Sequence, residues 1–138
     1  MNGYYLLIEY IKSLALSDND CNTFTEGDEL GDTDLKRQSI YPLMHLVADG
    51  GNFVNGVIQF DLELFALDQF DEQLQNDPDV FNTQLYVLKR IYNKLSISDG
   101  ISLLSEGAIQ KVERKENNLI GWSLTLQVEV ADDVMRFC

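Results

Sequence analysis

The stretch "NNLIGWSLTLQVEVADD", from Asn117 to Asp133, decides the fold of this chain. Every second residue from Ile120 to Val130 is apolar, whereas the residues between them are small or polar. Such alternation predicts a β-strand that buries one face against a core and exposes the other. The polar face carries no recognisable catalytic signature. A core role is favoured for Trp122, because it stands among the apolar positions.

Two helices are predicted to cover the apolar face of this strand. Within the first sixteen residues, apolar side chains recur every three or four positions, which is typical of an amphipathic helix. The segment "NDPDVFNTQLYVLKRIYNKLS" predicts a second helix, with Pro78 in its first turn. The first apolar face consists of Tyr4, Leu7, Ile8, Ile11, Leu14 and Ala15, and the second of Phe81, Leu85, Leu88, Tyr92 and Leu95.

Three further segments predict strands. The runs "QSIYPLMHLVADG" and "VNGVIQFDLELFALDQ" favour an antiparallel pair, and "DGGNFVNG" between them suits a hairpin turn. The segment "AIQKVERK" is expected to pair with the alternating strand in "NNLIGWSLTLQVEVADD" through a turn around "KENN". The prediction is therefore a single α+β domain over residues 1–138. It has a mostly antiparallel sheet of about four strands, with two main helices packed on one face.

Between the first helix and the first predicted strand lies the acidic segment "SDNDCNTFTEGDELGDTD". Its composition predicts a long acidic loop over residues 17–38. Four of its side chains match the first, third, fifth and twelfth positions of an EF-hand calcium loop, but Thr23 stands where that loop needs glycine. A solvated acidic loop is favoured, and a weak calcium site is the alternative. The four matching residues are Asp18, Asp20, Asn22 and Glu29.

The composition and charge restrict the class of protein. The chain has 138 residues, of which 45% are hydrophobic and 24% charged, as in soluble globular domains. Glu9 and Lys12 interrupt the opening stretch where a secretory signal would be apolar, so a cytoplasmic protein is expected. The net charge of -13 argues against tight binding to nucleic acid. This charge indicates plain solubility, or else a surface with a specific role. Such a surface would either face nucleic acid without binding it or bind a basic partner.

No catalytic, cofactor-binding or metal site is predicted from the residue types. His45 is the single histidine and lies in a predicted strand, where an ordinary hydrogen bond is favoured. Cys21 and Cys138 lack the spacing of a metal site or of a disulfide framework. Asp61 and Glu63 share one side of a strand, but a polar strand face more often serves solvation than acid–base catalysis. An enzyme is therefore not expected.

Three segments together resemble a known family: "NTFTEGDELGDTDLKRQSIYPLMHL", "FNTQLYVLKRIYNKL" and "NNLIGWSLTLQVEV", in a chain that ends in Cys. They are similar to small virion proteins of tailed bacteriophages, especially phages that infect Bacteroidetes, including the crAss-like group. The resemblance implies a neck or tail-terminator type of subunit, an α+β domain whose copies form a ring between portal and tail. The genome would pass through the channel of that ring without tight binding.

The resemblance also implies partners and contact segments. The expected partners are copies of the chain and neighbouring portal, adaptor or tail proteins, in the virion and in the host cytoplasm during assembly, with no membrane. The alternative is a small acidic phage protein that acts as a DNA mimic or inhibits a basic enzyme. Contacts are expected from the part of the acidic loop between Asp18 and Asp34, the turn from Asp49 to Asn55 and the short tail 134–138. The candidate contact residues are Asp18, Asp20, Phe24, Glu26, Asp28, Asp32, Asp34, Asn52, Phe53, Val134, Met135, Phe137 and Cys138.

Overall fold

Strand β6 (Leu119–Ala131), which contains the alternating stretch, lies inside the sheet and has strands on both of its edges. A computed structural model describes residues 3–27, 41–54, 56–69, 76–98, 100–104, 106–114 and 118–131. On one edge, β6 pairs along its whole length with β3 (Val57–Gln69) in antiparallel register. On the other edge it pairs with β5 (Ala108–Arg114) and then with β4 (Ile101–Leu103), both antiparallel.

The remaining strands continue the sheet beyond β3. Strand β2 (Leu43–Val54) pairs antiparallel with β3, and β1 (Thr23–Glu26) pairs parallel with β2. The described residues thus form a six-stranded mixed sheet in the order β1-β2-β3-β6-β4, with β5 also on β6. The prediction of an α+β domain is confirmed. The count of about four strands was too low, because β1 and β4 are short and β1 lies inside the predicted acidic loop.

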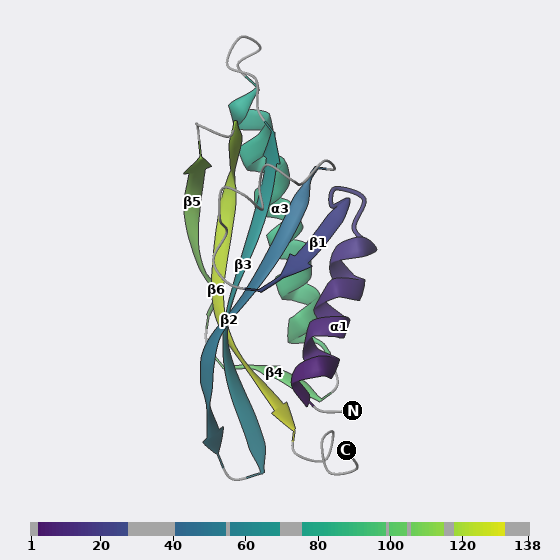
Figure 1. Cartoon of the computed structure of the whole chain (residues 1–138), viewed down its shortest axis with the longest axis vertical. Helices are drawn as coiled ribbons and strands as arrows, with labels where there is room; N and C mark the ends of the chain where they lie inside the picture. The colour runs from purple at the N-terminus through teal and green to yellow at the C-terminus, as the bar shows by residue number, and fades with distance from the viewer. Residues whose placement is uncertain are drawn as a thin grey trace.

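Both helices pack on the same face of the sheet, as predicted (Figure 1). Helix α1 (Gly3–Leu16) lies beside β1 and α3, whereas α3 (Asp77–Ser96) crosses β3 and β6. The apolar side chains of β6 point toward these helices, and Trp122 packs against the same core while staying partly exposed. The main core side chains from the two helices and β6 are Leu7, Ile11, Ala15, Val87, Leu88, Ile91, Leu95, Leu124, Leu126, Val128 and Val130.

The buried face of α3 differs from the predicted face. Phe81, Leu85 and Tyr92 are only partly buried, whereas the positions preceding them in the chain lie in or near the core. The observed face includes Gln84, which is buried although its side chain is polar. A pattern of apolar residues alone cannot place a glutamine in the centre of a buried face. The buried residues of α3 are Val80, Gln84, Val87, Leu88, Ile91 and Leu95.

The predicted hairpin between β2 and β3 is present, but its turn is shorter than expected. Residues of "DGGNFVNG" continue the ladder, with Gly51 opposite Phe60 and Phe53 opposite Ile58. A register shift between Ala48 and Gly50 accommodates the extra residue of a β-bulge. The strands therefore extend to Val54 and Val57, and the hairpin projects past the helices at one end of the molecule (Figure 1).

A smaller apolar cluster lies on the sheet face opposite the helices. Leu43, Leu67 and Leu119 are fully buried there, in neighbouring strands β2, β3 and β6. This part of the sheet therefore has apolar residues on both faces, which the alternating pattern of β6 alone does not predict. Within the described residues, no helix combines the length and the apolar character that crossing a bilayer requires.

The close approach of β3 and β6 requires glycine at position 121. A Cβ atom there would lie 1.9 Å from the carbonyl oxygen of Ala66, an oxygen that cannot move without separating the two strands. We expect Gly121→Ala to lower the free energy of unfolding by about 3 kcal/mol or more. Urea denaturation followed by circular dichroism measures this loss.

Thr125→Ala is the matched control, because Thr125 lies exposed on the same strand and the same face as Gly121. It should cost about 1 kcal/mol or less. Equal losses for the two variants would contradict the steric argument.

Candidate interaction surfaces

The end of the β2–β3 hairpin presents an apolar surface to solvent. We call residues 49–54 and 56–60 the hairpin tip. Phe53 is 88% exposed, more than any other large apolar side chain in the described part of the chain. Exposing such a ring is unfavourable unless a partner covers it. The sequence-predicted contacts Asn52 and Phe53 both lie in this tip and are exposed.

The side of the tip that faces the helices forms a shallow concave surface. Phe53, Ile58 and Phe60 line it together with Tyr4 from the start of α1, around a volume of about 580 Å³. The rings of Tyr4 and Phe60 lie 5.7 Å apart between centroids. The Tyr4 hydroxyl donates a 2.8 Å hydrogen bond to Oε1 of Glu26. Burial and this carboxylate raise the pKa of Tyr4 to about 12.

Glycine makes the twist of the tip possible. A Cβ atom at Gly51 would lie 2.0 Å from the carbonyl oxygen of Gln59 on the paired strand. Gly56 closes the turn with a positive φ of 79°, a conformation that favours glycine. Gly50 and Gly51, which predict a turn in the sequence, are therefore parts of a paired strand ladder.

Asp18 and Asp20, both predicted as contact residues, instead bind within the chain. The Arg90 guanidinium donates from Nε to Oδ2 of Asp18 at 2.8 Å and from Nη2 to Oδ1 at 2.9 Å. Nη2 also reaches Oδ2 of Asp20 at 3.0 Å. The Asp18 side chain is only 3% exposed, whereas Arg90 is 41% exposed. This cluster ties the segment after α1 to α3 and leaves Asp18 almost no side-chain surface for the predicted contact with a neighbour.

The same geometry argues against the calcium alternative at these residues. Both oxygens of Asp18 accept hydrogen bonds from Arg90, and Asn22 donates from Nδ2 to the carbonyl oxygen of Tyr41. A guanidinium thus occupies the position at which a cation would bind Asp18 and Asp20. In the described ranges, no group of three or more His, Cys, Asp or Glu side chains could hold a metal ion.

Two further predicted contacts lie in β1, a strand where the long acidic loop was expected. Phe24 packs against the core and Glu26 accepts the Tyr4 hydrogen bond. Parallel pairing with β2 places Thr25 beside His45, and Thr25 Oγ1 lies 2.6 Å from Nδ1 of His45. The ordinary hydrogen bond predicted for the histidine is confirmed. The described residues 17–27 thus contain a short strand within the segment for which the sequence predicted a loop.

Several predicted residues lie outside the described part of the chain. This applies to the remaining acidic contacts, to the fourth residue of the calcium alternative and to the C-terminal tail. Cys21 is described: it is buried and free, and burial raises its thiol pKa to about 11. The residues outside the description are Asp28, Glu29, Asp32, Asp34, Val134, Met135, Phe137 and Cys138.

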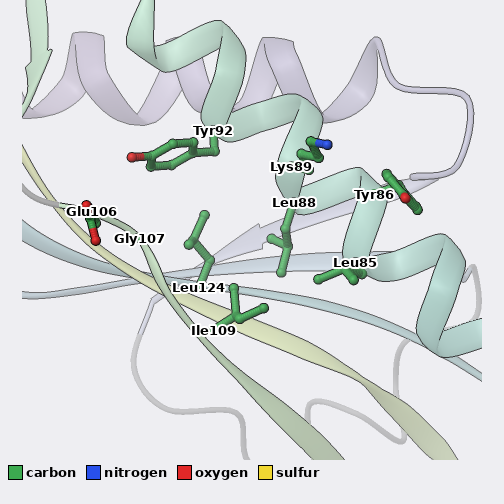
Figure 2. A pocket seen from close by; sticks show the side chains of 9 residues that line it. All are labelled: Leu85, Tyr86, Leu88, Lys89, Tyr92, Glu106, Gly107, Ile109 and Leu124. Carbon is green, nitrogen blue, oxygen red and sulfur yellow. The ribbon is translucent and has the colours of Figure 1, made fainter.

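A second apolar surface, which the sequence did not predict, lies between α3 and β5. We call it the α3–β5 groove; it encloses about 390 Å³. Figure 2 shows Leu85, Leu88, Ile109 and Leu124 converging between the helix and the strands, with Lys89 and Tyr86 on the helix. The full lining is Leu85, Tyr86, Leu88, Lys89, Tyr92, Glu106, Gly107, Ile109 and Leu124.

A glycine keeps the floor of the groove open, and contacts of aromatic rings lie next to it. A Cβ atom at Gly107 would lie 2.6 Å from Cδ1 of Leu124, so any larger residue would project into the floor. Trp122 donates from Nε1 to the Phe81 carbonyl oxygen at 2.8 Å, which ties the start of α3 to β6. The Lys111 ammonium lies 4.6 Å from the centre of the Phe81 ring. The sequence signal for this groove is that α3 has more apolar residues than one buried face needs, and that Leu85, Tyr86 and Tyr92 are among them.

No protein-family model and no curated protein matches this chain.

The Asp18–Arg90 pair predicts a stability that depends on pH. Hydrogen bonds from Arg90 are the main cause that lowers the Asp18 pKa in the folded state. The pair therefore stabilises the fold fully above the ordinary aspartate pKa of about 3.9. The stabilisation is lost as the pH falls through the lower folded-state pKa.

We expect Asp18→Asn to cost about 2 kcal/mol at pH 7. Partial solvation of Arg90 keeps the loss below the 3–5 kcal/mol of a fully buried pair. The difference from the wild type should shrink below about pH 4. Urea denaturation of both proteins between pH 7 and pH 3 measures this difference in the free energy of unfolding. Asp49→Asn, at an exposed hairpin carboxylate, is the control. A loss that stays constant down to low pH would contradict the assignment.

Proposed function

We propose that the chain is a structural subunit that assembles with its own copies into a ring at the head–tail junction or tail of a tailed-phage virion. The hairpin tip carries this proposal: it projects past the helices (Figure 1), and its Phe53 side chain is exposed to solvent. In the central part of β3 and β6, by contrast, the helix-facing side chains lie in the core under α1 and α3. A neighbouring subunit would supply the missing cover at the tip.

The assignment to a virion follows from the sequence resemblance, and the charge of the sheet agrees with it. On the face opposite the helices, β3 carries Asp61 and Glu63, and β6 carries Glu129 beside them. The sequence from Leu43 to Gln69 contains no lysine or arginine. Such a face would repel a phosphate backbone, as a channel that lets DNA pass without binding it requires.

In this proposal the chain is not an enzyme and needs no cofactor. Its partners are its own copies and adjacent portal, adaptor or tail proteins, and it assembles in the host cytoplasm before it enters the virion. Rings use head-to-tail contacts, so two different surfaces of one subunit must meet. The net charge of -13 also supports the second candidate, a DNA mimic that inhibits a basic enzyme.

Quantitative mass spectrometry of purified phage particles tests the proposal. We expect the chain in constant proportion to the portal protein, at a simple multiple of the portal count. Its absence from particles would overturn the virion assignment. A stable monomer that competes with DNA for a basic partner would favour the mimic instead.

Particles grown with Phe53→Asp should contain much less of the chain, because a carboxylate at the tip would have to be desolvated in the contact. Ile97→Asp is the matched control, since Ile97 is 82% exposed but lies at the end of α3. If Phe53→Asp entered particles in normal amounts, the hairpin tip would not be a contact between subunits.

A further inference from the structure

The described part of the chain has a protruding ring and, in a different region, a groove of matching chemistry. We propose that the hairpin tip of one copy inserts Phe53 into the α3–β5 groove of the next copy. This inference rests on the proposed function, because it assumes that copies of the chain associate, and it assigns the two surfaces that meet.

The size and lining of the groove suit an aromatic side chain. Its volume of about 390 Å³ exceeds the ~150 Å³ of an apolar cavity that accepts a benzene ring. Leu88 and Leu124 form a buried floor, and Ile109 is 48% exposed at the rim. A phenyl ring placed there would cover the exposed side chains of Ile109 and Tyr86 while losing its own contact with water.

The charges of the two surfaces are complementary. Asp49 is the one charged residue from position 49 to 60, and the paired strands β2 and β3 contain no lysine or arginine. The helix side of the groove carries Lys89, and Lys111 lies two residues beyond Ile109 in β5. Glu106 lies near Tyr92, away from Lys89 (Figure 2). An acidic tip that enters beside Lys89 would therefore meet an attractive potential.

The position of the two surfaces excludes insertion within one molecule. The hairpin turn lies at one end of the long axis, and β5 lies toward the opposite end (Figure 1). A contact between them must join two copies and leaves one free tip and one free groove. Such head-to-tail contacts propagate, and they close into a ring when the rotation between subunits permits.

Another apolar hollow fits this arrangement less well. It encloses about 410 Å³ between α1 and β4 and is lined by Leu7, Tyr10, Ile101 and Val130, among others. None of its lining residues is charged, so it offers no complement to the acidic tip. Only the α3–β5 groove combines exposed apolar rim residues with a lysine among the described hollows.

Mixing two variants tests the inference. Phe53→Asp damages the tip and leaves the groove intact, and Ile109→Asp does the reverse. Both positions are exposed, so both variants should fold like the wild type, as circular dichroism checks. Sedimentation velocity should show that each variant alone associates at least about 30-fold more weakly than the wild type, the factor expected for an interface hot spot.

An equimolar mixture of the two variants should form a 1:1 dimer and nothing larger. The intact tip of the Ile109 variant can enter the intact groove of the Phe53 variant, and the two remaining surfaces are both damaged. Ile97→Asp, which alters neither surface, should assemble like the wild type.

The outcomes separate this inference from the proposed function. Wild-type assembly without a dimer in the mixture, or undiminished assembly of Ile109→Asp, would overturn the pairing of tip and groove and leave a ring built by other surfaces. A wild-type chain that stays monomeric at all concentrations overturns the pairing between copies, and its simultaneous absence from particles overturns the proposed function as well.

Discussion

The antiparallel pairing of β3 with β6 is the interaction on which the rest of the structure depends. Thirteen residues of each strand face one another without interruption, from Val57 opposite Ala131 to Gln69 opposite Leu119. The strands approach so closely at Gly121 that no side chain fits there. The other strands and α3 are built on this pair: β2 and β1 extend it beyond β3, β5 and β4 extend it beyond β6, and α3 packs across both strands. Helix α1 then packs beside β1 and α3.

The sequence predicted those features that are repeated along a segment. Alternation over β6 and β3 and the 3.6-residue period of α1 identified the main elements and the side of the sheet that they bury. Features decided by single tertiary contacts were not predictable. The buried face of α3 includes Gln84 and so departs from the purely apolar stripe. Arg90, 70 residues beyond Asp20 in the chain, converts an expected solvated loop into an anchored segment.

The sequence predicted a turn over "DGGNFVNG" that is longer than the observed turn, and the physical reason bears on function. Glycine and asparagine between two apolar runs usually mark a turn, because they tolerate positive φ. Here Gly51 is needed because the paired strand approaches it closely, so the same composition produces a longer, twisted ladder. If the strands had ended at Asp49, as predicted, the hairpin would have stopped near the helices. Extension to Val54 carries Phe53 beyond them, and the candidate contact surface exists only for this reason.

The hairpin is also mechanically continuous with the core, which favours binding. Strands β2 and β3, which form the tip, also hold Leu46 and Leu62 in the core, and the same ladder sets the backbone position of Phe53. A contact made by a preorganised element loses less conformational entropy than one made by a loop that must first become ordered. In the proposed ring, this strand pair would carry the geometry of the sheet directly to the contact between neighbouring subunits. A flexible loop of the same composition could supply the apolar contact, but it would not define the rotation from which a closed ring follows.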